Sequence, residues 1–189
     1  EEKKKALYDF MNTCIEEDIC IAFSGGVDSS VLLQLARNCA EKKKRQSSIY
    51  AVTFHTMLHP SCDLEIAQKV AKEAGAIHKV LFVNELEQAE IRFNPKDRCY
   101  LCKKALFGKL KAYAEEKRVS CILEGTNEDD LHVYRPGLKA VKEMGVLSPL
   151  AMHGFTKEEV RRLAEELGVS VAKRPSTPCL ATRLPYGAE

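Results

Sequence analysis

Short apolar runs alternate with amphipathic stretches along this chain. Four of the runs are rich in branched and aromatic residues and end at polar residues or glycine, as buried strands do. These runs are CIAF, SIYAVTFH, HKVLFV and SCILEGT, which begin at Cys20, Ser48, His78 and Ser120. The pattern therefore predicts four short, buried strands.

Apolar residues at helical spacing lie between and after these runs. We expect helices over residues 29–39, 64–73, 103–117 and 156–167. Thr156 followed by Glu159 is the sequence signature of a capping box. Gly75 and Gly168 stand where helix C-caps belong.

Strands that alternate with helices predict an α/β fold, with a parallel sheet and helices on both of its faces. The chain has 189 residues, of which 45% are apolar, so one domain with an ordinary core is expected. Ligand sites in such sheets lie beyond the carboxyl ends of the strands. The stretches IAFSGG, VTFH, LFVN and LEGTN all end at that edge.

The charges nearly cancel, with 29 basic and 27 acidic residues. This balance gives no one-signed field that would attract nucleic acid or a membrane by charge alone. The sequence has no run of 18 apolar residues, and its start, EEKKKALYDF, lacks the features of a secretion signal. We therefore expect a cytoplasmic protein without a membrane or nucleic-acid partner.

The first predicted strand leads into Ser24-Gly25-Gly26-Val27-Asp28-Ser29, where a helix is expected to begin at about Asp28. Backbone N–H groups at a helix N-terminus carry positive partial charge, which suits a phosphate. The glycines let phosphate oxygens approach the backbone, and the serine hydroxyls add donors. Asp28 would repel bare phosphate, so it fits a magnesium ligand or a helix cap. We interpret the loop as a phosphate cradle without the ending of a Walker A motif, the alternative being a plain glycine turn.

The segment Ser24 to Ser29 resembles the SGGxDS motif of the PP-loop ATP pyrophosphatases. That resemblance implies a Rossmann-like doubly wound domain in an enzyme that grips the pyrophosphate of ATP and transfers AMP to a substrate oxygen. It also implies Mg²⁺, which shields the departing pyrophosphate. A nitrogen or sulfur nucleophile then displaces AMP.

Three of the eight cysteines bear on the nature of this nucleophile. Cys99 and Cys102 form a Cys-x-x-Cys pair in DRCYLCKK, and Cys179 lies in STPCLATR. Such a pair suits a metal or a cluster, and a third cysteine can complete a three-ligand site. Three thiolates would leave one iron of a [4Fe–4S] cluster open for sulfide. The alternatives are a zinc site and a Cys99–Cys102 redox disulfide.

The remaining cysteines have plainer interpretations. Cys20 and Cys121 fall within predicted strands and Cys39 lies on an apolar helix face, so we expect small buried hydrophobic side chains. The pattern assigns no role to Cys14 or Cys62.

Two later segments place charged residues beside glycine. GTNEDD, residues 125–130, follows the fourth predicted strand, and YRPGLKA begins at Tyr134. Adjacent carboxylates and an arginine suit a magnesium nucleotide and an anionic substrate, the alternative being a structural turn. With TRLPYG, which begins at Thr182, these segments make almost the whole chain similar to the LarE family of ATP-dependent sulfur transferases.

The LarE resemblance implies adenylation of a carboxylate of a pyridinium dicarboxylate mononucleotide. Sulfur then replaces AMP and gives a thiocarboxylate, a step in making the nickel-pincer nucleotide cofactor. Cys179 matches a cysteine that some members sacrifice and that others use, with two more cysteines, to hold an iron–sulfur cluster. Because Cys99 and Cys102 are present, we expect the cluster.

The same resemblance assigns the site residues. Arg183 and Lys103 are implied as cations for the phosphate or carboxylates of the substrate, and Arg135 with Asp130 would serve the nucleotide. The implied catalytic residues are Cys179, Asp28, Lys103 and Arg183. The implied nucleotide-binding residues are Ser24, Gly25, Gly26, Asp28, Ser29, Phe54, Gly125, Asp130 and Arg135. Asp28 would also hold Mg²⁺.

Residues 1–189 are expected to form one PP-loop domain that includes the cysteine-bearing tail. LarE-family members continue into a smaller C-terminal domain that contributes to the substrate site and to oligomer contacts. We expect that domain to be missing from this chain. The expected partners are the small nucleotide substrate and, through such contacts, further copies of the protein.

Three rival hypotheses stay open. One is a tRNA thiolation enzyme, against which the near-zero net charge argues mildly. A second is an ammonia-using amidating ligase such as NAD synthetase, in which the three cysteines would be incidental. The third is a nucleotide-binding or zinc-stabilised module without catalysis.

Overall fold

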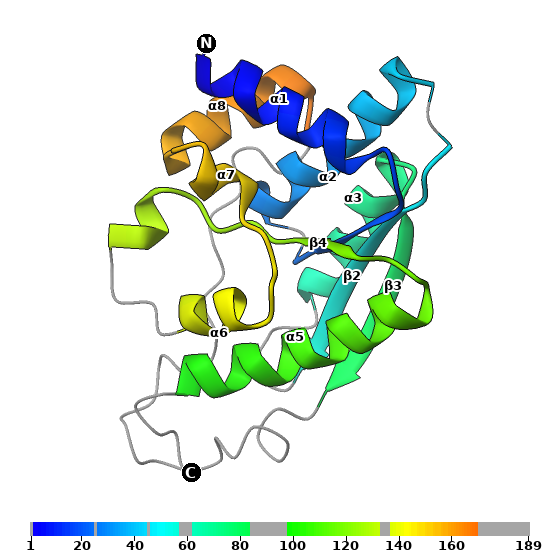
Figure 1. The fold of residues 1–189 in the computed structure, drawn as a ribbon, viewed down its shortest axis with the longest axis vertical. Helices are drawn as coiled ribbons and strands as arrows, with labels where there is room; N and C mark the ends of the chain where they lie inside the picture. Colours follow the sequence, from blue (N-terminus) through cyan, green and yellow to red (C-terminus); the bar gives the residue numbers. More distant parts are fainter. Residues whose placement is uncertain are drawn as a thin grey trace.

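Within the described residues, four parallel strands form one sheet, in the order β3-β2-β1-β4 (Figure 1). The computed structural model of the chain describes residues 2–24, 26–44, 46–56, 62–83, 98–132 and 137–169. Ile19 pairs with Ile49 on one side and with Cys121 on the other, which places β1 in the middle of the sheet. A parallel bridge between Leu123 and Leu147 continues the pairing beyond β4. The strands are β1 (Ile19–Ala22), β2 (Ile49–Thr56), β3 (Ile77–Val83) and β4 (Cys121–Leu123).

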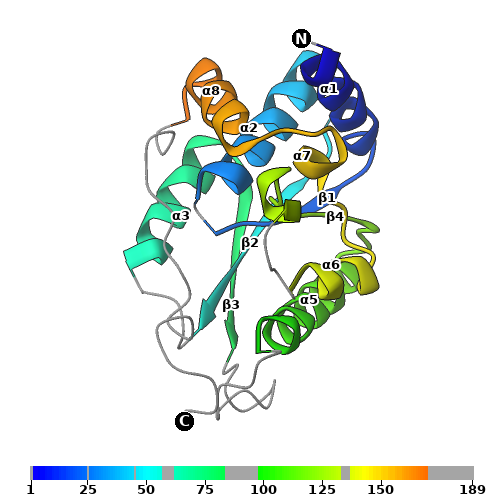
Figure 2. The same ribbon diagram turned by 90° about the vertical axis from the view of Figure 1, so that its left-hand side faces the viewer.

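Helices cover both faces of this sheet. Figure 2 shows α1, α2, α3 and α8 on one side and α5 and α6 on the other. The predicted α/β class, with a parallel sheet between two layers of helices, is therefore confirmed. The helices are α1 (Glu2–Cys14), α2 (Val27–Lys42), α3 (Cys62–Glu73), α5 (Arg98–Glu116), α6 (Gly137–Glu143), α7 (Pro149–Met152) and α8 (Lys157–Leu167), with a 3₁₀ turn at η1 (Asp129–His132).

The hydrophobic core is divided by the sheet into two clusters. The larger cluster joins β1 to α1, α2, α3 and α8, and the smaller one joins β1, β2 and β4 to α5 and α6. Helix α2 contacts α1, α3, α8 and the sheet, and ten of its 16 residues are buried as a result. Packing on several sides holds the N-terminus of α2 in a fixed position.

The predicted helix ends are confirmed. Thr156 is the N-cap of α8: its side chain accepts a hydrogen bond from the backbone N–H of Glu159, whose carboxylate accepts one from the backbone N–H of Thr156. Gly168 ends this helix in the left-handed region, at φ 72°. Gly75 has φ 67° just beyond α3, a conformation that glycine adopts without steric cost.

The strand order creates a switch point between β1 and β4. The chain builds β1, β2 and β3 in one direction and then crosses to the other side of β1 to form β4. Loops that leave neighbouring strands in opposite directions open a crevice outside the carboxyl ends of these strands. The sheet order therefore selects the loops after β1 and β4 as the place for a ligand.

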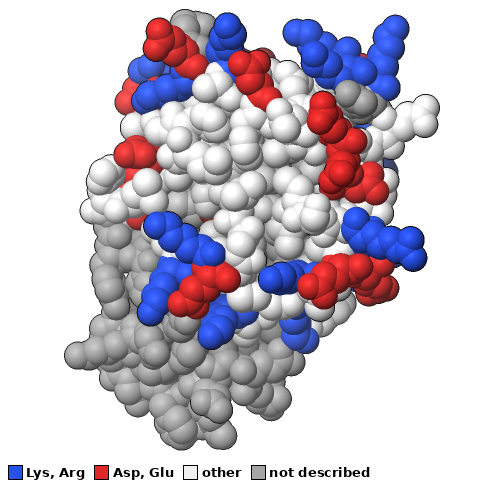
Figure 3. All heavy atoms as spheres, viewed as in Figure 1, with Lys and Arg blue, Asp and Glu red and all other residues white. Residues whose placement is uncertain are grey.

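Charged side chains of both signs are interspersed on the face seen in Figure 3, around an uncharged area. That face presents no one-signed field to a polyanion. Among the helices of the described segments, none combines the length and the apolar content that crossing a bilayer requires.

Candidate functional site

The loop after β1 delivers the chain directly into the first turn of α2. Gly26 is the N-cap residue, in an extended conformation with φ −77° and ψ 172°, and it has no side chain to cap the helix. The helix begins at Val27, one residue earlier than expected. A helix N-terminus without a capping side chain presents its N–H groups and the positive end of its dipole to an anion.

The two serines of the motif shape this loop through hydrogen bonds to each other. The backbone N–H of Ser24 donates to Ser29 Oγ at 3.2 Å, and the N–H of Gly26 donates to Ser24 Oγ at 3.2 Å. The two hydroxyl oxygens lie 3.3 Å apart. Ser24 is exposed while Ser29 is buried, so the pair runs from the protein interior to the surface of the cradle.

A hydrogen-bond chain from β2 and β3 supports Phe23, the residue that precedes the cradle. Thr53 on β2 donates its hydroxyl proton to the carbonyl oxygen of Phe23 at 2.7 Å. The Thr53 oxygen lies 2.7 Å from His78 Nε2 on β3, and because its own proton is already used, Nε2 is the donor. Burial lowers the pKa of His78, which keeps its ring neutral at pH 7.

Gly125, directly after β4, lies against the start of α2. A Cβ added at Gly125 would stand 3.0 Å from the Cβ of Asp28 and 3.0 Å from the backbone nitrogen of Ser29. Both neighbours are fixed parts of the helix, so neither can move aside cheaply. Only glycine at this position lets the two loops of the switch point approach each other this closely.

Replacing Gly125 with alanine should push the loop after β4 away from the cradle. We expect a loss of about 1–3 kcal/mol in the free energy of unfolding, as for other overpacked sites. We also expect at least about a tenfold weaker affinity for ATP, which corresponds to about 1.4 kcal/mol. Urea unfolding and calorimetric titration with Mg·ATP measure the two effects.

Gly108→Ala is the matched control. Gly108 lies within α5, and among the described residues a Cβ there would meet the Met144 side chain, at an ordinary contact distance of 3.9 Å. Alanine is the better helix former, so this variant should be neutral or slightly more stable and should keep its ATP affinity. Equal behaviour of the two variants would contradict a tight approach at Gly125.

Asp28, in the first turn of α2, is held by residues from two other elements. Lys157 Nζ lies 2.8 Å from Asp28 Oδ2, and Asn127 Nδ2 donates to Asp28 Oδ1 at 3.3 Å. The Asp28 and Lys157 side chains are 22% and 26% exposed, so their ion pair is only partly screened by water. The helix-cap interpretation of Asp28 is wrong, because the N-cap is Gly26.

Asp130 takes part in a local turn. Its carboxylate accepts a hydrogen bond from the backbone N–H of Asn127 at 3.0 Å, and its own N–H donates to Asn127 Oδ1 at 3.1 Å. Asp129 Oδ2 accepts a bond from the backbone N–H of Lys157 at 2.9 Å. The GTNEDD segment therefore ties the loop after β4 to the N-terminus of α8, and the nucleotide role of Asp130 stays a prediction.

Glu124 is a buried carboxylate between β4 and this turn. Its Oε2 accepts bonds from the backbone N–H and the hydroxyl of Thr126, at 3.1 and 2.8 Å, and its Oε1 accepts one from the hydroxyl of Ser148. Three donors compensate for taking this carboxylate out of water. Glu124 thus fixes the turn that presses Gly125 against α2.

Sequence reasoning missed Lys157, Asn127 and Glu124. The position of Glu124 and Asn127 could have suggested them as site residues, because both lie within four residues of the end of β4, at the ligand edge of the sheet. For Lys157, the sequence offered only its position at the start of α8, just after the N-cap Thr156. The sequence did not reveal that this helix end faces the first turn of α2, because that contact joins residues 129 positions apart.

Of the other predicted site residues, the structure describes Phe54 fully, some by their backbone alone, and the rest not at all. Phe54 lies near the carboxyl end of β2, where its ring makes an edge contact with Phe107 on α5.

Helix α5 connects β3 to the parallel strand β4, so its first residues lie toward the carboxyl edge of the sheet, as the cradle does. Cys99, Cys102 and Lys103 belong to the start of α5 by backbone, but their side chains lie outside the described residues. Gly25, Arg135, Cys179 and Arg183 lie outside them altogether.

The donors at the cradle suit one kind of metal site. Within the described segments, no three His, Cys, Asp or Glu side chains gather in a group that could hold a metal ion by itself. Mg²⁺ in nucleotide sites needs no such cage, because one or two carboxylates are completed by phosphate oxygens and water. Asp28 at the start of α2 is a donor of this kind.

The backbone gives positions for Cys99 and Cys102. The two residues are three apart in a helix, which places these positions on the same side of α5. Two cysteine positions on one side of a helix are compatible with ligands of one cluster or one metal ion.

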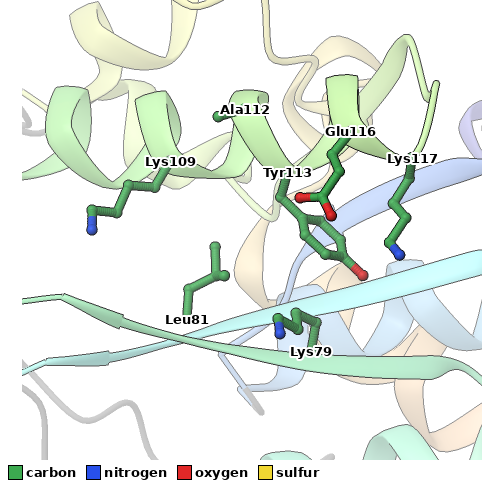
Figure 4. Close-up of a pocket in the computed structure, with 7 residues that line it drawn as sticks. All are labelled: Lys79, Leu81, Lys109, Ala112, Tyr113, Glu116 and Lys117. Carbon is green, nitrogen blue, oxygen red and sulfur yellow. The ribbon is translucent and has the colours of Figure 1, made fainter.

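A hollow of about 460 Å³ lies elsewhere, between β3 and α5 (Figure 4). It is lined by Lys79, Leu81, Lys109, Ala112, Tyr113, Glu116 and Lys117. None of these residues comes from the loops after β1 or β4, so the hollow is separate from the cradle.

Comparisons with known proteins agree with this geometry. The PP-loop domain family matches residues 1–135. An uncharacterised protein of Synechocystis sp. is 37% identical over 169 residues, which are 89% of this chain and 61% of that protein. The pyridinium-3,5-bisthiocarboxylic acid mononucleotide synthase of Lactiplantibacillus plantarum is 31% identical over 169 residues, which are 89% of this chain and 60% of that enzyme. The chain thus spans about three fifths of the length of these relatives.

The fold is also similar to a solved structure, the NMN synthetase from Francisella tularensis, with a TM-score of 0.69. That similarity covers 95% of this chain and 75% of the other at 17% sequence identity, a level that supports the fold alone.

Proposed function

This chain belongs to the PP-loop domain family, and we propose that it is the ATP-binding part of a sulfur transferase that adenylates a carboxylate and replaces AMP with sulfur. The observation that carries the proposal is the uncapped N-terminus of α2 with Asp28 in its first turn. The sulfur chemistry is supported by the similarity to a pyridinium-3,5-bisthiocarboxylic acid mononucleotide synthase.

The cradle would hold the pyrophosphate part of ATP. The N–H groups in the first turn of α2 and the hydroxyls of Ser24 and Ser29 would supply donors for phosphate oxygens. Asp28 would bind Mg²⁺, whose charge stabilises the departing pyrophosphate. Lys157 is paired with Asp28 in the first turn of α2, and its ammonium group would turn to a phosphate oxygen when the nucleotide is bound. The magnesium ion would then compensate for the charge of Asp28.

The first step would join substrate and nucleotide. A carboxylate oxygen of a pyridinium dicarboxylate mononucleotide attacks the α-phosphorus of ATP, the bond to the bridging oxygen breaks, and pyrophosphate leaves. The product is an acyl adenylate. Arg183 and Lys103 would hold the anionic substrate, and Phe54, Gly125, Asp130 and Arg135 would serve the nucleotide side.

The second step would replace AMP with sulfur. A sulfur nucleophile adds to the acyl carbon, the carbon–oxygen bond to AMP breaks, and a thiocarboxylate is formed. Cys99, Cys102 and Cys179 would hold a [4Fe–4S] cluster, which supplies an open iron where an extra sulfide can bind. A sacrificial Cys179, which would give up its own sulfur, is the alternative within the same reaction.

Two other functions make different predictions. An amidating ligase would use ammonia and would not require Cys179. A tRNA thiolation enzyme would release pyrophosphate only with RNA, which a basic surface should attract. The near balance of 29 basic and 27 acidic residues favours the small-molecule substrate.

The decisive experiment supplies Mg·ATP, sulfide and pyridinium-3,5-dicarboxylic acid mononucleotide to the iron-reconstituted protein without oxygen. We expect pyrophosphate release that depends on the mononucleotide, and a product in which sulfur replaces one oxygen, detected by mass spectrometry. ATP binding without any pyrophosphate release would contradict the adenylation. Pyrophosphate release with ammonia or with tRNA, but not with the mononucleotide, would favour one of the rival functions.

A further inference from the structure

The backbone ladder between β1 and β2 ends at Phe23, the residue before the cradle. The backbone N–H of Phe23 still donates to the carbonyl oxygen of Val52 at 2.8 Å, as in a parallel ladder. Its own carbonyl oxygen accepts the hydroxyl proton of Thr53 at 2.7 Å, and no backbone N–H of the described residues donates to it. A side chain therefore replaces a backbone donor at the point where the chain leaves the sheet.

His78 on β3 fixes the orientation of the Thr53 hydroxyl. It stands two residues before the register partner of Thr53, so the two side chains are diagonal neighbours on one face of the sheet. His78 Nε2 lies 2.7 Å from the Thr53 oxygen and donates to it. Thr53 is only 6% exposed, so water has little access to either bond. One acceptor and one donor thus hold the hydroxyl in a single orientation.

The ring of His78 also contacts Phe23 directly. The two rings meet edge to face, with centroids 6.2 Å apart and an angle of 89° between their planes. Edge-to-face packing is a favourable arrangement of two aromatic rings. His78 therefore holds Phe23 at its side chain and, through Thr53, at its carbonyl oxygen.

One rigid peptide unit connects these contacts to the cradle. The carbonyl of Phe23 and the backbone N–H of Ser24 belong to the same planar peptide unit, so fixing the direction of one fixes the other. That N–H donates to Ser29 Oγ at 3.2 Å, and Ser29 Oγ lies 3.3 Å from Ser24 Oγ. A continuous chain of contacts thus runs from β3 to the two hydroxyls of the cradle.

We propose that Thr53 and His78 are positioning residues, which orient the peptide unit before Ser24 so that the cradle hydroxyls face the pyrophosphate part of the nucleotide. The proposal rests on the proposed function, because it takes ATP as the ligand of the cradle. The Thr53 hydroxyl gives its proton to Phe23. Thr53 therefore acts on the nucleotide through the peptide unit and not by donating to a phosphate.

Thr53→Val is the first test, since valine keeps the branched shape of threonine but has no hydroxyl. The variant leaves the carbonyl oxygen of Phe23 and the Nε2–H of His78 without their partner, so the peptide unit can turn. We expect the affinity for Mg·ATP to fall about tenfold. Calorimetric titration measures it, at a temperature where urea unfolding shows every variant to be folded. Thr53→Ser restores the hydroxyl and should stay within about threefold of the wild-type affinity.

Thr13→Val is the matched control. Thr13, on α1, donates its hydroxyl to the carbonyl oxygen of Asp9 at 3.2 Å, in an exposed bond within the helix. Its loss should leave the affinity for Mg·ATP within about twofold. Reduced stability of Thr53→Val together with an unchanged affinity would mean a merely structural role for Thr53 and would overturn the proposal.

Two measurements without nucleotide separate this proposal from the proposed function. Amide hydrogen exchange at Ser24 should be at least about fivefold faster in Thr53→Val and unchanged in Thr13→Val. The nitrogen-15 spectrum of the wild-type chain at pH 7 should show a neutral His78 with its proton on Nε2, a signal assigned by its loss in His78→Gln.

A His78 proton on Nδ1, or equal exchange of Ser24 in the two variants, would overturn the positioning role even if the chain binds ATP. A wild-type chain that shows both signatures but does not bind Mg·ATP would overturn the proposed function, and with it the role of Thr53 and His78 in holding a nucleotide.

Discussion

An Asp28→Asn variant should release pyrophosphate on the order of 100-fold more slowly than the wild-type protein. The substitution keeps the shape of the side chain but removes the negative charge that would hold Mg²⁺. It also leaves Lys157 without its carboxylate partner at 2.8 Å. The measurement is mononucleotide-dependent pyrophosphate release over a range of Mg²⁺ concentrations, and extra Mg²⁺ should restore only part of the rate.

Glu41→Gln is the matched control for Asp28. Glu41 lies in the last turn of the same helix, where its carboxylate is 3.1 Å from Arg37 Nε, and both side chains are exposed. This variant also loses one acidic partner of an ion pair on α2, but far from the cradle, so its rate should stay within about twofold because exposed pairs contribute little. Equal rates in Asp28→Asn and the wild-type protein would remove Asp28 from the proposed magnesium site.

A Cys179→Ala variant should lose sulfur transfer completely while it still releases pyrophosphate. Adenylation needs only the cradle, ATP and the substrate, whereas the second step needs sulfur delivered at the acyl adenylate. The measurement combines pyrophosphate release with mass spectrometry of the product. An intact thiocarboxylate yield in this variant would contradict both the cluster and the sacrificial use of Cys179.

Iron content distinguishes Cys179 as a cluster ligand from Cys179 as a sacrificed sulfur donor. After anaerobic reconstitution with iron and sulfide, the wild-type protein should bind about four irons and absorb broadly in the visible region. Cys99→Ala, Cys102→Ala and Cys179→Ala should each lose this absorbance, while Cys39→Ala, a change at a buried cysteine on α2, should keep it. A wild-type protein that binds no iron but still transfers one sulfur per chain would point to a sacrificed Cys179.

Much of the fold was predictable because its signals are local. Each predicted strand overlaps an observed one, since branched and aromatic runs such as SIYAVTFH pack well in a pleated, buried sheet. The capping box at Thr156 was predictable because both of its hydrogen bonds lie within four residues. The start of α5 was not predicted, and its first residues carry the cysteine pair at 99 and 102.

The burial of Cys121 was not predicted correctly from the sequence. An apolar strand predicted a buried hydrophobic side chain, but the side chain is only half-buried. Strand composition does not reveal that Cys121 is the first residue of a three-residue strand. Its exposure depends on how the helices and the sheet pack, which local patterns do not encode.

The sequence by itself was enough to predict a phosphate-binding loop, because the motif Ser24 to Ser29 consists of six consecutive residues between a predicted strand and a predicted helix. Only the tertiary structure decided what surrounds it: the pairing of Asp28 with Lys157, the approach of Gly125 and the buried Glu124. These contacts join residues far apart in the chain, and they exist because the strand order places β4 beside β1 and packs α8 on α2. Spacing along a sequence cannot determine them, since many chain foldings satisfy the same local pattern while only packing of the whole core selects one.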